Sequence, residues 1–247
     1  TGVQTCALPI LFFFITGLIM LIIFIIVELG AEDPLLQFKA FKYPEFSKGL
    51  SLMWLNQIAV FGSMLLIPLY LQNQLNYSSL EAGLLMVPQA LASFVGLTVG
   101  GKLFDKYGTK SAVIPGLIIM LVSLGFLTKV SETSTAIYLL IAIVALGLGQ
   151  GLVNMQVNNH ALKSIPLSMI NRVTPLSNEM LQVVNSFSIA FLTTFLTKQM
   201  SDTRFSTLNK RAIHAYHNTF LLLVIFVGIA LILSFFINDK KIPTRKK

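Results

Sequence analysis

The sequence predicts an all-α integral membrane protein. Hydrophobic residues make up 55% of its 247 residues and charged residues only 11%, whereas a soluble domain carries roughly 25% charged residues. The charges fall between apolar runs that reach the ~20 residues a spanning helix needs. Helices satisfy their backbone hydrogen bonds within the segment, and these runs are too long and too uniformly apolar for the strands of a β-barrel.

Seven charge-free windows mark the expected spanning helices. In chain order they are residues 10–27, 49–71, 82–101, 111–128, 133–158, 180–197 and 218–238. The opening stretch, TGVQTCALPI, has no initiator Met, basic n-region or small-residue cleavage site, so it is not a signal peptide. We expect residues 1–10 to be foreign to the protein and the chain to be a fragment. The one cysteine, Cys6, allows no intramolecular disulfide.

The Lys and Arg residues predict which helix ends face the cytoplasm. If the C-terminus is cytoplasmic, segments 28–48, 102–110, 159–175 and 239–247 are inside and hold 13 of the 18 basic residues, against 5 outside. The net charge of +8 then orients the helices and meets anionic lipid headgroups. No nucleic-acid partner is expected. Apolar and charged residues alternate between 30 and 48, which predicts a short amphipathic helix at the interface.

Polar side chains inside the windows are candidates for a cavity, because polar groups are costly in a bilayer. Gln150, Asn154 and Asn158 recur every four residues in the fifth window and so share one helical face. The other candidates are Asn56 and Gln57 in the second window, Gln89 in the third, and Gln182 and Asn185 in the sixth. Such amides either bind substrate in a wet cavity or join helices to one another, and both interpretations stay open.

Glu179 stands at the start of the sixth window. Buried, it would be a candidate proton site; exposed in the first turn of a helix, it would be a favourable partner of the helix dipole. His160, His214 and His217 are the only histidines, and a metal site needs more converging ligands than they offer. No catalytic motif is visible either. We therefore expect no enzyme activity, no metal site and no cofactor.

The stretch GGKLFDKYGTK places glycines and charges between the third and fourth windows. We predict that Gly101 admits a neighbouring helix at close range, that Gly108 takes a positive φ at a tight turn, and that Asp105 accepts from free N–H groups of the next helix. A charged loop of this kind suits a contact that forms in one conformation and opens in another. The expected conformational loop comprises Gly101, Leu103, Asp105, Lys106, Gly108 and Lys110.

This loop resembles the cytoplasmic motif of the major facilitator superfamily, of general form G-x-L-a-D-r-x-G-r-k. Two further stretches, PLYLQNQLNYSSLEAGLLMVPQAL and LGLGQGLVNMQ, resemble the fourteen-spanner drug:proton antiporters of the EmrB/QacA type. In the loop the chain departs from the pattern at Phe104 and Thr109, where a small residue and Arg are usual. In the sixth window, Leu181, Val184, Asn185 and Ser188 replace an Arg and glycines of a similar family stretch.

The resemblance implies a domain organisation and a function. Residues 11–29 would be an extra transmembrane helix, 30–48 a cytoplasmic interfacial linker, 49–238 the six-helix C-terminal half of a transporter, and 239–247 a basic cytoplasmic tail. The protein would export small amphipathic compounds across the plasma membrane in exchange for protons, by alternating access. Its partner would be the missing N-terminal half, which carries the coupling carboxylates, and the loop around Asp105 would brace one state against that half.

Three other functions compete with this interpretation. A lipid or metabolite permease of the same superfamily is the main alternative. A seven-helix receptor or pigment is less favoured, because a retinal pigment needs a lysine in its last helix and residues 218–238 contain none. A membrane enzyme would need acids, histidines or a serine–base pair converging at one depth, and the sequence shows no such group.

Overall fold

The computed structural model describes residues 38–130, 136–201 and 208–238, together with single residues and short runs between 12 and 27. A 3-10 helix, η1 (Phe38–Lys42), precedes the α-helices of these three ranges. They are α2 (Pro44–Gln74), α3 (Ser79–Tyr107), α4 (Thr109–Leu127), α5 (Ala136–Lys163), α6 (Leu167–Met200) and α7 (Leu208–Phe235). Each of the six is long and apolar enough to cross a membrane. The predicted all-helical membrane fold is therefore confirmed.

The predicted first span, 10–27, is only partly covered. Its described residues are helical, and their apolar side chains are exposed, from Ile15 at 47% to Phe12 at 66%. The segment predicted to be foreign, 1–10, and the basic tail, 239–247, lie outside the described residues. Of the predicted interfacial linker, residues 44–48 already belong to α2, and η1 is the only helical turn described in the rest of it.

The helices extend well beyond the charge-free windows. Helix α3 runs through Lys102 and Asp105 to Tyr107, and α6 begins at Leu167, in a stretch expected to be a loop. Charged side chains near a helix end reach water without ending the helix, so charge marks the membrane boundary and not the helix boundary. The start of α3 is fixed by a capping box, in which Ser78 and Glu81 each accept from the other's backbone N–H.

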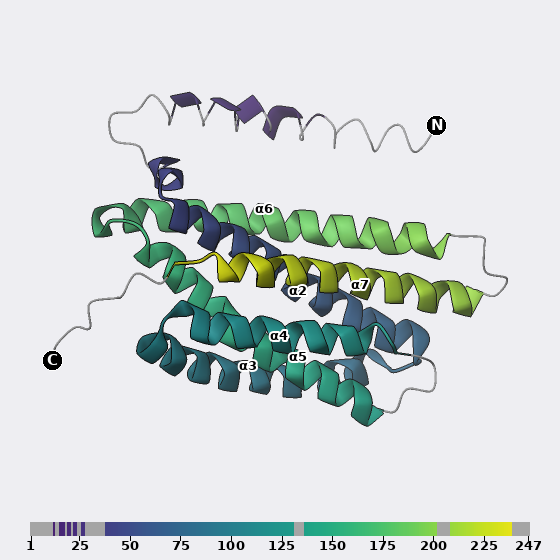
Figure 1. Ribbon diagram of the computed structural model, residues 1–247. Coiled ribbons are helices and arrows are strands. Elements are labelled where there is room, and N and C mark those ends of the chain that lie inside the picture. The colour runs from purple at the N-terminus through teal and green to yellow at the C-terminus, as the bar shows by residue number, and fades with distance from the viewer. Residues whose placement is uncertain are drawn as a thin grey trace.

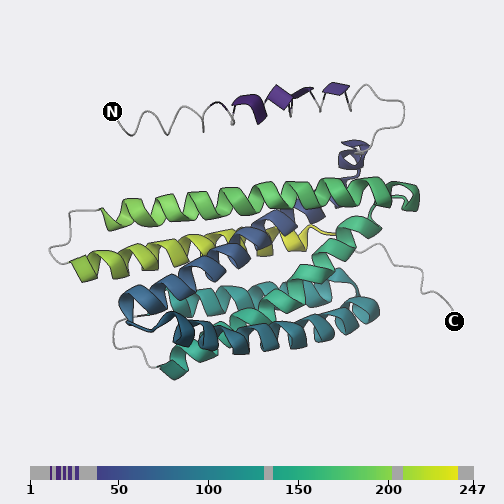
Figure 2. The same cartoon turned by 180° about the vertical axis from the view of Figure 1, so that it is seen from behind.

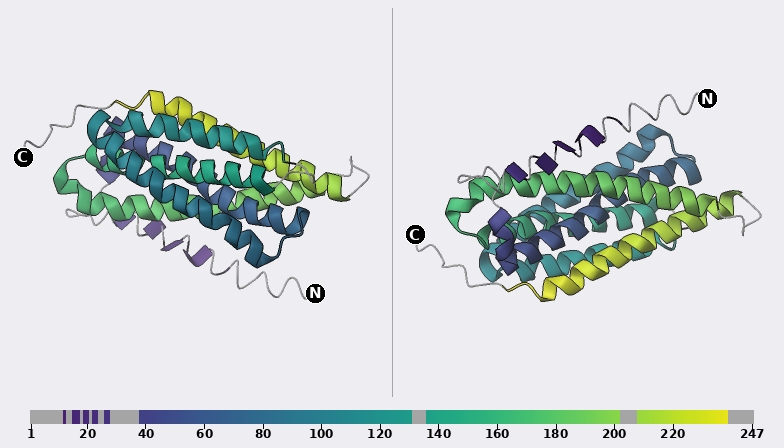
Figure 3. Two further views of the ribbon diagram at one scale, coloured as in Figure 1. Left: turned by 90° about the horizontal axis from the view of Figure 1, so that it is seen from below. Right: turned by 90° about the horizontal axis from the view of Figure 1, so that it is seen from above.

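The six helices form an elongated bundle with their axes roughly along one direction (Figures 1 and 2). Helices α3 and α4 both pack extensively on α5, while α7 packs on α2, α4 and α6. Helix α2 crosses between these two groups and also contacts α5 (Figure 3). In Figure 1, α6 lies along the upper side of the bundle and α3 along the lower side. Helix α5 is therefore the element against which α2, α3 and α4 are placed.

Glycines let α3 and α5 approach with their backbones in contact. A Cβ on Gly96 would overlap the carbonyl oxygen of Leu148, and one on Gly151 would overlap the carbonyl oxygen of Ser93. Gly147 has the same relation to the backbone of Gln89. Small residues four apart on facing helices are the usual means of close packing in membranes, where no hydrophobic force draws helices together.

The prediction that Gly101 admits a neighbouring helix is wrong. A Cβ there would meet nothing within 4 Å, whereas one on the adjacent Gly100 would lie 2.6 Å from Nε2 of Gln156 and 3.1 Å from the Cα of Leu152. The two glycines are about 100° apart around the helix, so only Gly100 faces α5. Gly149, between the glycines that face α3, points instead to α4, where a Cβ would lie 2.8 Å from the carbonyl oxygen of Gly116.

A polar cluster joins four helices at one end of the bundle. The carboxylate of Glu45 accepts from Lys48 Nζ at 2.8 Å and from the backbone N–H of Asn238 at 2.9 Å. Nε2 of His160 lies 3.8 Å from the same carboxylate, and Nδ1 of His160 lies 3.0 Å from the hydroxyl of Thr109. The cluster therefore ties the start of α2 and of α4 to the ends of α5 and α7.

Two lysines complete this end by capping α7. Lys48 donates to the carbonyl oxygen of Phe236 at 3.0 Å, and Lys110 donates to that of Phe235 at 2.9 Å. The last carbonyls of a helix have no partner within the helix, and a cation also complements the negative end of the dipole.

The backbone contact between α3 and α5 predicts opposite effects for two Gly→Ala substitutions. Gly151→Ala should lower the stability of the bundle by about 1–3 kcal/mol, because the new methyl overlaps the backbone of α3. Gly101→Ala is the matched control, since its methyl has open space and alanine favours the helix. Thermal unfolding in detergent, followed by the fluorescence of the single Trp54, measures both. Equal melting temperatures would contradict the packing described here.

The polar cluster predicts that Glu45→Ala destabilises the chain by about 1–3 kcal/mol, because the change leaves Lys48, His160 and the Asn238 N–H without their shared acceptor. Glu179→Ala, at an exposed carboxylate, is the control and should leave the melting temperature unchanged. The same detergent unfolding experiment compares them. A loss of stability at position 179 as large as at position 45 would show that the cluster is not what holds this end together.

Candidate functional site

A cavity of about 380 Å³ opens between α2, α3 and α5, and one residue of α6 reaches it. Four of the predicted cavity residues line it, namely Asn56, Gln57, Asn154 and Asn158. Helical spacing explains why they meet, since Asn154 and Asn158 are one turn apart on α5 and face the neighbouring pair on α2. The polar part of the lining consists of amides and a hydroxyl.

The other residues of the lining were not predicted from the sequence. The largest of these side chains are Met53, Leu97, Met155 and Leu181, and Ser93 adds the hydroxyl. Spacing could have found two of them, because Ser93 and Leu97 follow Gln89 at intervals of four on α3. The methionines give the cavity an adaptable apolar wall, as flexible thioether side chains do at promiscuous binding surfaces.

Asn56 is the buried polar anchor of the cavity. Only 2% of the residue is exposed, and its Nδ2 donates to Oδ1 of Asn154 at 2.9 Å. This bond joins α2 to α5 across the cavity wall. The other amide atom of Asn56, Oδ1, is buried and has no hydrogen-bond partner among the described residues.

Gln89 and Gln150 belong instead to a buried chain of hydrogen bonds that links three helices. Nε2 of Gln89 donates to Oε1 of Gln150 at 3.3 Å, Nε2 of Gln150 donates to the hydroxyl of Ser63 at 3.2 Å, and Ser63 donates to the carbonyl oxygen of Ala59 at 2.8 Å. Both glutamines are more than nine-tenths buried. In this geometry they join α3, α5 and α2, which is the interhelical role that the sequence had left open.

The predicted polar residues of α6 lie apart from the cavity. Gln182 and Asn185 bond to each other at 3.3 Å and are not part of its lining. Glu179 is exposed and stands in the fourth turn of α6, twelve residues after Leu167. The interpretation of Glu179 as a first-turn dipole partner is therefore wrong, because α6 begins far earlier than its apolar window.

The GGKLFDKYGTK stretch is two helix ends with a single residue between them. Gly108 alone separates α3 from α4, and its φ of 91° with ψ of −176° is a conformation open essentially only to glycine. The predicted positive φ is thus confirmed. Asp105, by contrast, is exposed in the last turns of α3, and no side chain caps α4. The predicted capping role of Asp105 is wrong because the carboxylate still belongs to α3, on the other side of the turn.

The two departures from the loop motif are both buried. Phe104 is 3% exposed, and Nζ of Lys163 lies 4.3 Å from the centre of its ring. Thr109 is 2% exposed and contacts His160 in the polar cluster. Leu103 offers its carbonyl oxygen to Ser111 at 3.0 Å, and Lys106 stands over the ring of Tyr107 at 5.0 Å.

Within the described ranges, no group of three or more His, Cys, Asp or Glu side chains is arranged to hold a metal ion. His214 and His217 lie at the end of the bundle opposite His160. Nε2 of His217 donates to the carbonyl oxygen of Val130 at 2.6 Å, and Nδ1 of His214 contacts Nδ2 of Asn218 at 3.2 Å. The first contact joins α7 to the residue three positions after α4, the second lies within α7, and the two converge on no common point.

Comparisons with known proteins agree with this architecture. The family model described as Major Facilitator Superfamily matches residues 6–190 and, in a second match, residues 50–247. The lincomycin resistance protein LmrB of Listeria monocytogenes is 33% identical over 183 residues, which are 74% of this chain and 39% of that protein. A multidrug resistance protein B homolog of Mycobacterium tuberculosis is 26% identical over 190 residues, 76% of this chain and 35% of that protein. The chain thus spans about two fifths of the length of these relatives.

A solved structure supports the fold independently of sequence similarity. The crystal structure of tetrameric PepTSo2 superposes with a TM-score of 0.66 at 18% identity, over 78% of this chain and 40% of that one. The family match covers the described helices from α2 to α7. We conclude that the chain is a multi-pass membrane protein that belongs to the major facilitator superfamily.

Proposed function

We propose that this chain is the C-terminal half of a proton-coupled exporter of amphipathic compounds. The observation that carries the proposal is the cavity between α2, α3 and α5, whose wall combines amides with methionine and leucine side chains. Such a mixture suits ligands with an apolar body and a few polar groups. The printed names of relatives, lincomycin resistance and multidrug resistance proteins, support the same class of substrate.

In the proposed mechanism, six-helix halves rock about a cavity near the middle of the membrane. The polar contacts to substrate come from the four amide side chains that line the cavity, Asn56, Gln57, Asn154 and Asn158. Gln89 and Gln150 hold the helices that carry them. The missing N-terminal half would supply the coupling carboxylate, and Glu179 would exchange protons in the transport cycle only where that half covers it.

The loop residues have a proposed role at the surface between halves. Asp105, Lys106 and Tyr107 are exposed on the last turns of α3, so they are free to meet the other half in one conformation and to leave it in another. The polar cluster around Glu45 keeps this end of the half rigid, which a rocking motion of whole halves needs.

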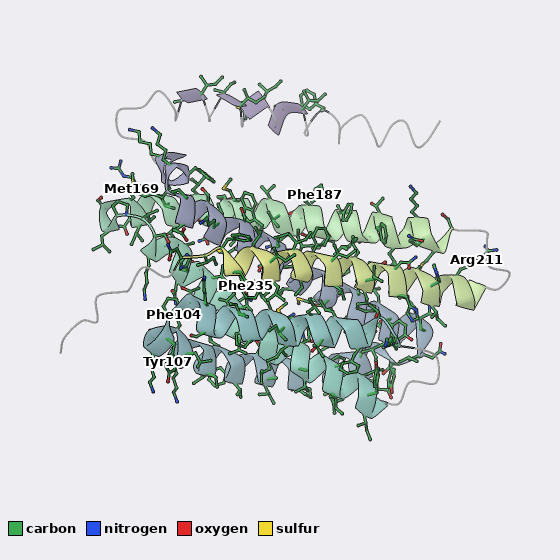
Figure 4. All side chains as sticks on the ribbon, viewed as in Figure 1. Phe104, Tyr107, Met169, Phe187, Arg211 and Phe235 are labelled. Atoms are coloured by element: carbon green, nitrogen blue, oxygen red, sulfur yellow. The ribbon has the colours of Figure 1, made fainter. Side chains whose placement is uncertain are left out.

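We further propose that this end faces the cytoplasm in the plasma membrane. Phe104, Tyr107 and Met169 lie at one end of the bundle and Arg211 at the other (Figure 4). The lysines of the GGKLFDKYGTK stretch and Lys48 near the start of α2 lie at the first end, which supports a cytoplasmic assignment by the positive-inside rule.

The proposed function predicts that transport needs both halves. In everted vesicles, the full-length transporter that contains this chain should accumulate ethidium when a proton gradient is applied and lose it when an uncoupler is added. Residues 1–247 alone should accumulate none, because alternating access requires a second half. Gradient-driven uptake by the chain alone, or gradient-independent movement by the full protein, would contradict the proposal.

The proposed orientation predicts the labelling of Asp105→Cys in a background in which Cys6 is replaced by Ser. A membrane-impermeant maleimide should react with this cysteine in everted vesicles and spare it in intact cells. Ser201→Cys, exposed at the opposite end of α6, is the matched control and should show the reverse pattern. Labelling of position 105 from outside intact cells would contradict the proposed orientation.

A further inference from the structure

Of the two polar side-chain atoms of Asn56, which lines the cavity, only one has a hydrogen-bond partner among the described residues. Nδ2 of Asn56 donates to Asn154 at 2.9 Å, while Oδ1 of the same side chain is buried and finds no donor among the described residues. Buried polar atoms in folded proteins nearly always have a partner, so an exception at a cavity wall calls for a partner from outside the chain. A carbonyl oxygen can only accept, and that partner must therefore be a donor.

The surroundings of Asn56 are built for a ligand larger than a single water. The cavity measures about 380 Å³, and Met53, Leu97 and Leu181 form its apolar wall. The residue itself is 2% exposed, so its oxygen is well shielded from bulk water. A hydrogen bond made in such a place discriminates more strongly than one made at the surface, because a ligand without the donor leaves the oxygen unpaired.

Other amide oxygens share this state but do not line the cavity. Those of Gln74, Gln89, Gln156 and Asn185 are also buried without a partner among the described residues, and none of the four belongs to the lining. Nε2 of Gln89 is hydrogen-bonded to Gln150, and Nε2 of Gln156 contacts the backbone of Leu97 at 3.5 Å. Among these five amides of the described residues, Asn56 is therefore the one that both lines the cavity and has a buried oxygen without a partner.

We propose that Asn56 determines specificity by accepting a hydrogen bond from the substrate, so that the cavity selects amphipathic compounds that carry an N–H or O–H group beside an apolar ring or chain. This inference rests on the proposed function, which makes the cavity a substrate site. It adds that the substrate class is defined by a donor and not by apolar character alone. Compounds whose nitrogen atoms are fully alkylated fall outside the preferred class.

A pair of dyes tests the proposal on the 247-residue chain in lipid nanodiscs. Rhodamine 6G carries secondary amines with N–H groups, whereas rhodamine B ethyl ester is a similar cation whose nitrogens are fully ethylated. Equilibrium dialysis gives the dissociation constant of each. We expect rhodamine 6G to bind about tenfold more tightly, since the ester leaves the oxygen of Asn56 unpaired.

Three variants assign the preference to Asn56. Asn56→Leu should reduce the tenfold ratio to about one, and Asn56→Asp, which keeps the acceptor oxygens, should retain it. Asn158→Leu removes another lining amide and should weaken both dyes without changing their ratio. Size-exclusion profiles and the melting temperature show whether each variant folds, and Asn56→Ala, which also lacks the acceptor oxygen, takes the place of the Leu variant if that one does not fold.

The possible outcomes separate the inference from the function on which it rests. Equal binding of both dyes by the unsubstituted chain, tighter binding of the alkylated dye, or loss of the ratio in Asn158→Leu would overturn the role of Asn56 and leave the cavity as a binding site. Binding of neither dye would overturn the assignment of the cavity to amphipathic substrates, and the inference with it. A preference lost only in Asn56→Leu would support both.

Discussion

The backbone contact between α3 and α5 is the interaction on which the rest of the bundle depends. Gly96, Gly100, Gly147 and Gly151 replace side chains with direct approach of one helix to another. The approach brings Gln89 within hydrogen-bond distance of Gln150 and sets Ser93 and Leu97 beside Asn154. Because the hydrophobic effect does not hold helices together in lipid, this surface complementarity must do so. A cavity of defined shape follows from it.

Helix α6 shows what happens without such glycines. No glycine occurs between Leu167 and Met200, and the contact with α2 includes the Leu192 side chain against Gly62. The family stretch that α6 resembles has glycines where this chain has Val184, Asn185 and Ser188. Helix α6 packs on its neighbours less extensively than α3 packs on α5, and it contributes a single leucine to the cavity.

The sequence predicted the spans and one special backbone position, and it failed where the answer depended on a neighbour. Apolar windows locate all six described spans, and Gly108 follows from the local need for a positive φ. Periodicity also places Gln150 and Asn154 on one face of α5. It does not say which helix lies opposite, so it could not predict that Asn154 lines the cavity and that Gln150 does not. For the same reason, the sequence could not show that Gly100 faces α5 and that Gly101 does not.

Errors at helix ends have a different physical origin. Charge ended each predicted window, yet the helices around Asp105 and Glu179 continue into the polar layer, where water satisfies the side chains and the backbone bonds continue unbroken. The sequence likewise did not predict the contact of His160 with Thr109 and Glu45, because these three residues are far apart along the chain. Only tertiary structure reveals such a cluster.

The polar cluster and the two lysines that cap α7 determine where the protein can be extended or shortened. Glu45 holds the amide of Asn238, and two lysines hold the carbonyls of Phe235 and Phe236. A reporter domain fused after Asn238 would start from an anchored point, so its position would report the tilt of the whole helix bundle. Deleting the chain back past Phe235 would remove the anchor, because Lys48 and Lys110 would lose these carbonyl acceptors and Glu45 would lose the backbone N–H of Asn238.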